Sequence, residues 1–116
     1  MKIVKFYTTK AGDSPVEEFI DSLSAKQAQK VVWVLKLFED LDFVPSQYFK
    51  KLTNTDDIWE VRIQLGNNIF RILGFLEGDQ IILLTNGFVK KSQKTPKGEV
   101  EIAGKRKKEY ESRGDE

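Results

Sequence analysis

Two arginines and a carboxylate lie close together in the middle of the chain. The segment Ile58 to Arg62 contains Glu60 and Arg62, and the short motif Phe70-Arg71-Ile72 follows it. Arginine presents a planar set of donors that binds phosphate oxygens in pairs, and it stays protonated at any physiological pH. Both arginines are therefore candidates for holding a phosphate group and for stabilising charge that develops on it.

A lysine-rich segment, Lys90 to Lys97, follows the last strand-like stretch, which contains Asn86 and Phe88. A lysine run is most often solvated surface, but this one continues a strand that delivers an aromatic ring. Cations that track phosphates around an exposed ring favour single-stranded nucleic acid, because the ring stacks on a base. We therefore expect Phe88 to stack and Lys90 and Asn86 to bind substrate, with Lys50 and Lys51 as further cations.

The chain has no histidine and no cysteine. Disulfides, thiolate metal sites and cysteine nucleophiles are excluded, and the usual neutral-pH base is missing. A lysine among other cations has a lowered pKa, so one of Lys90, Lys91 and Lys94 could be partly neutral. Glu60 is the carboxylate alternative as base. We expect Lys91 and Lys94 to bind phosphate or transfer protons, with no metal and no cofactor.

The net charge of +1 conceals a segregation of charge along the sequence. Residues 1–88 carry 10 basic and 12 acidic side chains, residues 89–108 carry 8 and 2, and residues 109–116 carry 1 and 4. A basic stretch of this density indicates an anionic partner. The chain shows no signal peptide, and its longest apolar run, Val31 to Leu35, is far too short for a membrane span. We expect a cytoplasmic protein without membrane contacts.

The first half of the sequence predicts a strand over 2–8 and two helices. Ser14-Pro15 caps the first helix, whose apolar stripe ends at Leu23, and Ser24 caps the second, which runs to about Leu41. Trp33 lies off the apolar stripe of the second helix, and we assign its side chain either to packing within the protein or to a surface that contacts a partner protein. Residues 43–54 have few periodic apolar positions and read as a connecting segment.

The second half predicts a three-stranded antiparallel meander over 58–65, 68–76 and 80–89. Two-residue turns with glycine first, Gly66-Asn67 and Gly78-Asp79, join the strands. Thr95 and Pro96 read as the cap and first residue of a C-terminal helix that ends near Tyr110. The fold class is α+β, and we expect a single domain over 1–116.

The two turns fix a register in which Arg62 faces Arg71 and Arg71 faces Asn86. This register puts the arginines on one face with the residues Glu60, Gln64, Ile69, Leu73, Phe75, Ile82, Leu84, Phe88 and Lys90. The other face is almost wholly apolar and suits burial under the two helices. It comprises Trp59, Val61, Ile63, Leu65, Phe70, Ile72, Gly74, Ile81, Leu83 and Thr85. Facing arginines repel, so either Glu60 or the acidic C-terminus neutralises one, or a ligand phosphate supplies the counter-ion.

These motifs, in their order and spacing, resemble the HigB-like, phage-derived branch of the RelE/ParE toxin superfamily. That branch reads tryptophan-glutamate-aliphatic-arginine, then aromatic-arginine-isoleucine, then glycine-phenylalanine-x-lysine-lysine-x-x-lysine-threonine-proline, as Gly87 to Pro96 does here. The resemblance implies a RelE-like α+β fold and the toxin of a type II toxin–antitoxin pair. It further implies metal-independent cleavage of mRNA on the ribosome, and silencing by a helix-turn-helix, HigA-like antitoxin.

The sequence departs from several relatives at the end of the last strand. Those relatives use histidine, tyrosine or aspartate there, whereas this chain has no histidine and has Phe88 where some have tyrosine. Three other interpretations stay open. The basic face could bind RNA or a ribosomal protein without catalysis, the toxin could act on gyrase as ParE-type proteins do, or the protein could serve mainly to pair with a neighbouring regulator.

Overall fold

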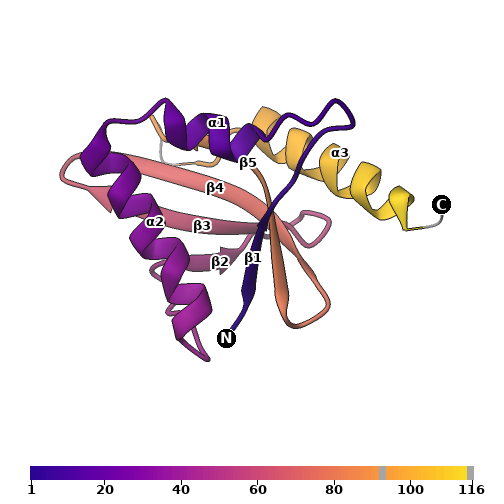
Figure 1. Cartoon of the computed structure of the whole chain (residues 1–116), viewed down its shortest axis with the longest axis horizontal. Helices are drawn as coiled ribbons and strands as arrows, with labels where there is room; N and C mark the ends of the chain where they lie inside the picture. The colour runs from indigo at the N-terminus through magenta and orange to yellow at the C-terminus, as the bar shows by residue number, and fades with distance from the viewer. Residues whose placement is uncertain (92–93, 115–116) are drawn as a thin grey trace.

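The computed structural model describes residues 1–91 and 94–114 (Figure 1). Ser92 and Gln93 of the lysine-rich segment, and Asp115 and Glu116 of the acidic tail, lie outside the described residues. A five-stranded sheet has the order β1-β5-β4-β3-β2. The elements are β1 (Ile3–Phe6), α1 (Pro15–Asp21), α2 (Ala25–Asp40), β2 (Phe49–Lys51), β3 (Trp59–Leu65), β4 (Asn68–Glu77), β5 (Ile81–Val89) and α3 (Lys97–Arg113).

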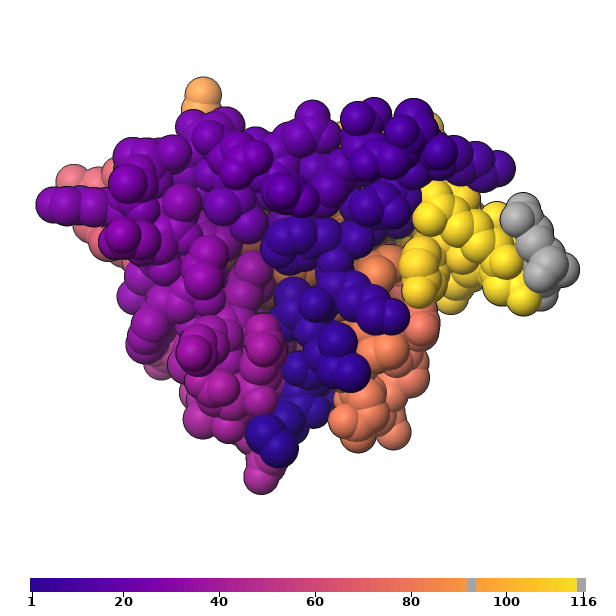
Figure 2. All heavy atoms as spheres, in the orientation of Figure 1, coloured from indigo at the N-terminus to yellow at the C-terminus, as the bar shows by residue number. Residues whose placement is uncertain are grey.

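Helices α1 and α2 cover one face of the sheet, as Figure 2 shows from their side of the molecule. Both predicted caps are present. The Ser14 hydroxyl accepts from the amide of Glu17, and Ser24 and Gln27 form a complete capping box. The stripes of the two helices pack on apolar residues of the sheet, namely Val61, Ile63, Phe70, Ile72, Ile82 and Leu84. For β3 and β4, the helical hairpin therefore buries the face that the sequence assigned to it.

The first hairpin has the predicted register. Gly66 adopts a positive φ of 61°, which glycine tolerates without strain, and the two-residue turn leaves Leu65 opposite Asn68. Arg62 consequently lies opposite Arg71. The pairing that the site depends on is confirmed.

The second hairpin has a different register from the predicted one. Glu77 pairs with Ile81, so the turn has three residues instead of two, and a bulge between Leu73 and Gly74 adds a further shift. Arg71 therefore lies opposite Phe88, whereas Asn86 lies opposite Leu73.

The two shifts affect the strand β5 differently along its length. In residues 81–84 of β5, the longer turn alone shifts the register by one residue and puts each side chain on the face opposite to the predicted one. Ile82 and Leu84 therefore pack under α1 and α2, while Leu83 packs on the other side of the sheet. From Asn86 onward, the bulge adds a second shift of one residue. The two shifts together equal the two-residue period of a strand, so these side chains return to the predicted faces. The predicted side of the sheet was therefore wrong for the first half of β5, whereas Phe88 still lies on the face of Arg71.

Strand β2 falls inside the segment that the sequence predicted to be a connection. Phe49–Lys51 pairs antiparallel with Trp59–Val61 and forms one edge of the sheet. Phe49 is buried, stacks on Trp59 with ring centroids 4.5 Å apart, and meets Phe38 of α2 edge-on at 4.8 Å. Three residues are too short for a visible periodicity, so tertiary aromatic packing decides this strand.

Helix α3 covers part of the other face of the sheet. Ala103 packs with Ile58 and Leu73, and Tyr110 packs beside Phe75 and Leu83. The helix begins at Lys97 with Pro96 as its N-cap residue and makes no side-chain cap bond. The predicted cap at Thr95 is therefore wrong, because its hydroxyl is used elsewhere, as described below.

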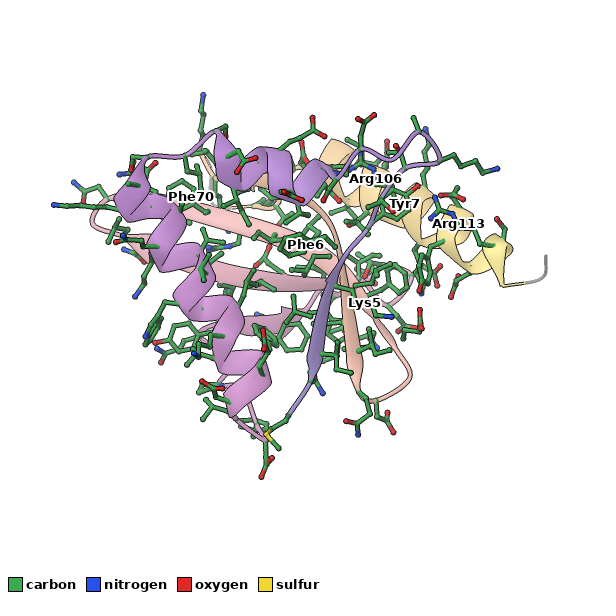
Figure 3. The ribbon with its side chains drawn as sticks, in the orientation of Figure 1. Lys5, Phe6, Tyr7, Phe70, Arg106 and Arg113 are labelled. Carbon is green, nitrogen blue, oxygen red and sulfur yellow. The ribbon has the colours of Figure 1, made fainter. Side chains whose placement is uncertain are left out.

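Polar contacts fix α3 at two points. The buried Lys107 donates to the backbone carbonyl of Asp56 at 2.7 Å. Near the helix end, the buried Tyr7 donates to Glu109 at 2.5 Å and lies beside the guanidinium groups of Arg106 and Arg113 (Figure 3). Of the described helices, none is long and apolar enough to cross a membrane.

Candidate functional site

Glu60 occupies the centre of a buried ionic cluster. Its side chain is 2% exposed, and its Oε1 lies 3.2 Å from the Nε of Arg62 and 3.3 Å from the Nε of Arg71. The hydroxyl of Thr95 donates to the other carboxylate oxygen at 2.5 Å. The strand period places Glu60 and Arg62 on one face, and the hairpin register brings Arg71 alongside. Glu60 is thus the counter-ion that both arginines share.

One carboxylate serves two guanidinium groups in this cluster. Neither Nε is aligned to make a hydrogen bond to a partner among the described residues, although both lie at ion-pair distance. Burial lowers the pKa of Arg71, Glu60 opposes that effect, and the charge of Arg62 lowers the pKa further. The cluster is held together, but its positive charge exceeds its negative charge.

A hollow of about 510 Å³ opens beside this cluster. Its lining includes Lys50, Lys51, Leu52, Thr53, Thr55, Glu60, Arg62, Lys90, Lys94, Thr95 and Val100. Lys51 also forms an exposed ion pair with Asp57 at 2.8 Å. Segments far apart in the sequence therefore place at least five basic side chains around one opening. The structure brings Lys50, Lys51, Lys90 and Lys94 together with Arg62 around this hollow; their roles stay predictions.

Lys90 is the lysine most directly affected by the arginines. Burial lowers its pKa, and the charges of Arg71 and Arg62 lower it further, with Glu60 opposing them. Its backbone amide donates to the carbonyl of Ile69 at 2.8 Å, which continues the sheet past the end of β5. The position of Lys90 is therefore fixed by the same strand pairing that fixes Arg71.

Three of the predicted site residues have other surroundings. Asn86 is buried, and its amide nitrogen donates to the backbone and side chain of Glu99 in α3. Phe88 is half-buried and packs in the small cluster around Leu73 and Ala103. Lys91 is exposed and does not line the hollow beside Glu60. Their substrate or catalytic roles stay predictions.

A second hollow, of about 470 Å³, shares Arg62 with the first. It is lined by Lys30, Gln47, Tyr48, Arg62, Ile63, Gln64 and Arg71. The sequence pointed to Arg62, Arg71 and the neighbouring Gln64, but not to Lys30 or to Gln47 and Tyr48. These residues belong to α2 and to the segment before β2, and no spacing in the sequence relates them to the arginine motifs.

The described residues contain no group of three or more histidine, cysteine, aspartate or glutamate side chains that could hold a metal ion. The polar groups gathered at the site are instead cations around a single carboxylate. Such an arrangement suits an anionic ligand.

Comparison with known families identifies one family for this chain. Residues 18–108 match the family described as "Phage derived protein Gp49-like (DUF891)". The chain belongs to this family. Gp49-like proteins are toxins of toxin–antitoxin systems and are related to RelE and HigB, so an antitoxin is the implied partner of this Gp49-like protein. No curated protein matches the chain. The α+β architecture is compatible with a RelE-like fold.

Proposed function

We propose that this Gp49-like protein is a HigB-like toxin of a type II toxin–antitoxin system that cleaves mRNA on the ribosome. The observation that carries the proposal is the buried Glu60 between Arg62 and Arg71, at the wall of a hollow that Lys90 and Lys94 also line. A single domain over 1–116, acting in the cytoplasm, would contain the whole site.

The charge of the site supports a phosphodiester as its ligand. The charge of Arg62 lowers the pKa of both Arg71 and Lys90, and the carboxylate of Glu60 opposes this effect at both groups. Bringing cations together in this way costs free energy, and a bound phosphate recovers it. The 510 Å³ hollow lies within the range that accommodates a ligand the size of a nucleotide.

The proposed reaction is an attack by the ribose 2′-oxygen on the adjacent phosphorus. The P–O2′ bond forms as the P–O5′ bond breaks, the 2′-hydroxyl loses its proton to a base, and the departing 5′-oxygen gains one. Arg62 stabilises the negative charge on the non-bridging oxygens, because its guanidinium lines the opening and remains protonated. The products are a 2′,3′-cyclic phosphate and a 5′-hydroxyl.

Lys90 is the side chain best placed to take the proton. Its lowered pKa increases the share of neutral amine near neutral pH, and it lines the same hollow as Arg62. Lys94, at the same wall, contacts phosphate or protonates the leaving oxygen. Glu60 is buried between two arginines and accepts from Thr95, so in this scheme it positions the arginines and is not the base.

The remaining predicted residues extend the interface around this centre. Lys50, Lys51 and Lys91 contact the backbone of the message on either side, and Phe88 offers the uncovered part of its ring to a base. The site lacks histidine, so it has no intrinsically strong base at neutral pH. Orientation of the message by the ribosome then supplies much of the rate enhancement. A helix-turn-helix, HigA-like antitoxin would block this face or the toxin's access to the ribosome.

The test uses the purified chain in a reconstituted translation reaction, with mapping of the 5′ ends of the message. We compare the wild type with Arg62→Ala, and with Lys36→Ala as a control that removes one exposed charge elsewhere. The wild type and Lys36→Ala are expected to cut at fixed positions within codons and to cut the same RNA poorly without ribosomes. Arg62→Ala is expected to lose at least about 100-fold in cleavage, as for other preorganised charge-stabilising groups.

The chemistry of the ends distinguishes this reaction from metal-assisted hydrolysis. The expected fragments carry a 5′-hydroxyl and a 2′,3′-cyclic phosphate. Fragments with 5′-phosphates, or equal cleavage of free and ribosome-bound RNA by a clean preparation, would contradict the proposal. Unaltered cleavage by a folded Arg62→Ala variant would contradict the role of the cluster.

A further inference from the structure

We infer that the 470 Å³ hollow between α2 and the edge of β3 is a second RNA subsite, which binds a nucleotide next to the cleaved phosphate. The inference rests on the proposed function and extends it to surfaces that the arginine and lysine motifs do not include. In this view, Lys30, Trp33 and Tyr48 hold the message while the Glu60 cluster acts on it.

The lining of this hollow has the chemistry of a nucleotide site. Lys30, Arg62 and Arg71 supply positive charge, and Gln47 and Gln64 supply amide groups that both donate and accept hydrogen bonds. Among the described residues that line it, none carries a carboxylate. A phosphate satisfies the cations, and the amides match the donor and acceptor pattern of an unpaired base edge.

An aromatic pair borders the hollow. Tyr48 lines it, and the Trp33 ring meets the Tyr48 ring edge-on with centroids 6.0 Å apart. Lys30 Nζ lies 4.4 Å from the centre of the Trp33 ring. Trp33 nevertheless remains 49% exposed, which is a large apolar surface for α2 to leave in solvent. An exposed ring with an adjacent cation is the arrangement that stacks a base and contacts its phosphate.

Arg62 connects the two hollows, because it lines both of them. A single strand that places one phosphate at Arg62 can therefore extend from the Lys90 side to the Lys30 side without leaving basic surface. The backbone of this region is fixed, since the Arg62 amide donates to the carbonyl of Tyr48 at 2.8 Å. Arg62 and the aromatic pair thus keep a constant spacing, which suits a ligand with a regular repeat of base and phosphate.

The experiment measures binding separately from cleavage. The probe is a fluorescent single-stranded RNA of about eight nucleotides. All its 2′-hydroxyls are methylated, so it cannot be cut. Anisotropy titrations at several salt concentrations compare the wild type with Lys30→Ala and Trp33→Ala. The matched controls are Lys36→Ala and Val32→Ala, because both residues are exposed on α2 and border a different, mainly apolar hollow.

We expect Lys30→Ala and Trp33→Ala each to weaken RNA binding about fivefold or more, whereas Lys36→Ala and Val32→Ala leave it unchanged. The salt dependence should separate the two contacts. Lys30→Ala should reduce the slope of log affinity against log salt by about 0.7, the value for one phosphate contact on a single strand, and Trp33→Ala should leave the slope unchanged.

Three outcomes would overturn the subsite. They are equal losses in test and control variants, no measurable binding by the wild type at low salt, and a defect seen with the cognate antitoxin but not with RNA. The last result would make the hollow a contact for an acidic protein segment. A selective loss of RNA binding by a protein that cuts no message would keep the subsite and refute the nuclease, so the two failures are distinguishable.

Discussion

Replacing Glu60 by glutamine tests the reasoning on which the site depends. The variant keeps the size and an accepting oxygen of the side chain but removes the charge that Arg62 and Arg71 share. Because Glu60 is 2% exposed and the side chain of Arg71 is 10% exposed, solvent cannot replace that charge at little cost. The two arginines then face each other across the hairpin with no carboxylate between them.

The structure sets the size of the effect. At 3.2 and 3.3 Å, each attraction is about 5 kcal/mol with an effective dielectric constant of about 20, before the cost of burying the charges is counted. Removing one partner of a buried ion pair costs about 3–5 kcal/mol. Since the amide oxygen of Glu60→Gln still accepts from an arginine, we expect about 3 kcal/mol. A domain of this size would lose roughly 10 °C in Tm.

The assay is urea denaturation followed by circular dichroism at neutral pH. Glu39→Gln is the control, because Glu39 is exposed on α2 and its loss should change the free energy of unfolding by less than about 0.5 kcal/mol. A second arm adds inorganic phosphate. Phosphate should stabilise Glu60→Gln more than the wild type, because an anion that binds the uncompensated arginines of the folded state raises the free energy of unfolding.

Equal stability of Glu60→Gln and the wild type would refute the reasoning. It would mean that other groups neutralise the arginines without Glu60, and that an anion between the arginines does not stabilise the folded state. A second result would refute the step in which the cluster accepts a phosphate as counter-ion. In that result Glu60→Gln loses much stability, but phosphate stabilises it no more than it stabilises the wild type.

Three further predictions follow from the fold and the electrostatics. Gly74→Ala should lower the free energy of unfolding by at least about 2 kcal/mol in urea titrations, because the new Cβ would lie 2.4 Å from the backbone oxygen of Leu83. Lys107→Met should loosen α3 by about 1–2 kcal/mol, seen as faster amide exchange in that helix, since the backbone oxygen of Asp56 loses its donor. Lys90, observed by NMR of its side chain, should titrate below the ordinary lysine value of about 10.4. Because the unfolded chain then holds that proton more tightly, stability should rise with pH through the folded pKa of Lys90 up to about 10.4, and Lys90→Arg should abolish this rise.

The order of the strands explains why the site lies where it does. Arg62, Arg71 and Lys90 come from three neighbouring strands or their extensions, and the sheet brings them to one end. Thr95, near the end of the lysine-rich segment, reaches back to Glu60. This hydrogen bond ties the segment to the buried carboxylate just before α3 begins.

The sequence alone determined the local structure and one decisive pairing. Ser14 and Ser24 cap their helices because a hydroxyl satisfies amides only three residues away. Gly66 fixes a two-residue turn, and the period of a strand then places Arg62 opposite Arg71. These features are readable from the sequence because the interactions that create them involve neighbours along the chain.

Only the tertiary structure decided which groups surround the arginines. Two offsets in the second hairpin moved Asn86 away from Arg71, because the turn length and the bulge depend on how β5 packs on both faces. Glu60 became a buried counter-ion because Arg62, Arg71 and the hydroxyl of Thr95 meet at its carboxylate. Lys30 and Tyr48 reached Arg62 through the packing of α2 and the edge strand. Such contacts join distant segments, and their free energy depends on burial and on charges that are absent until the chain has folded.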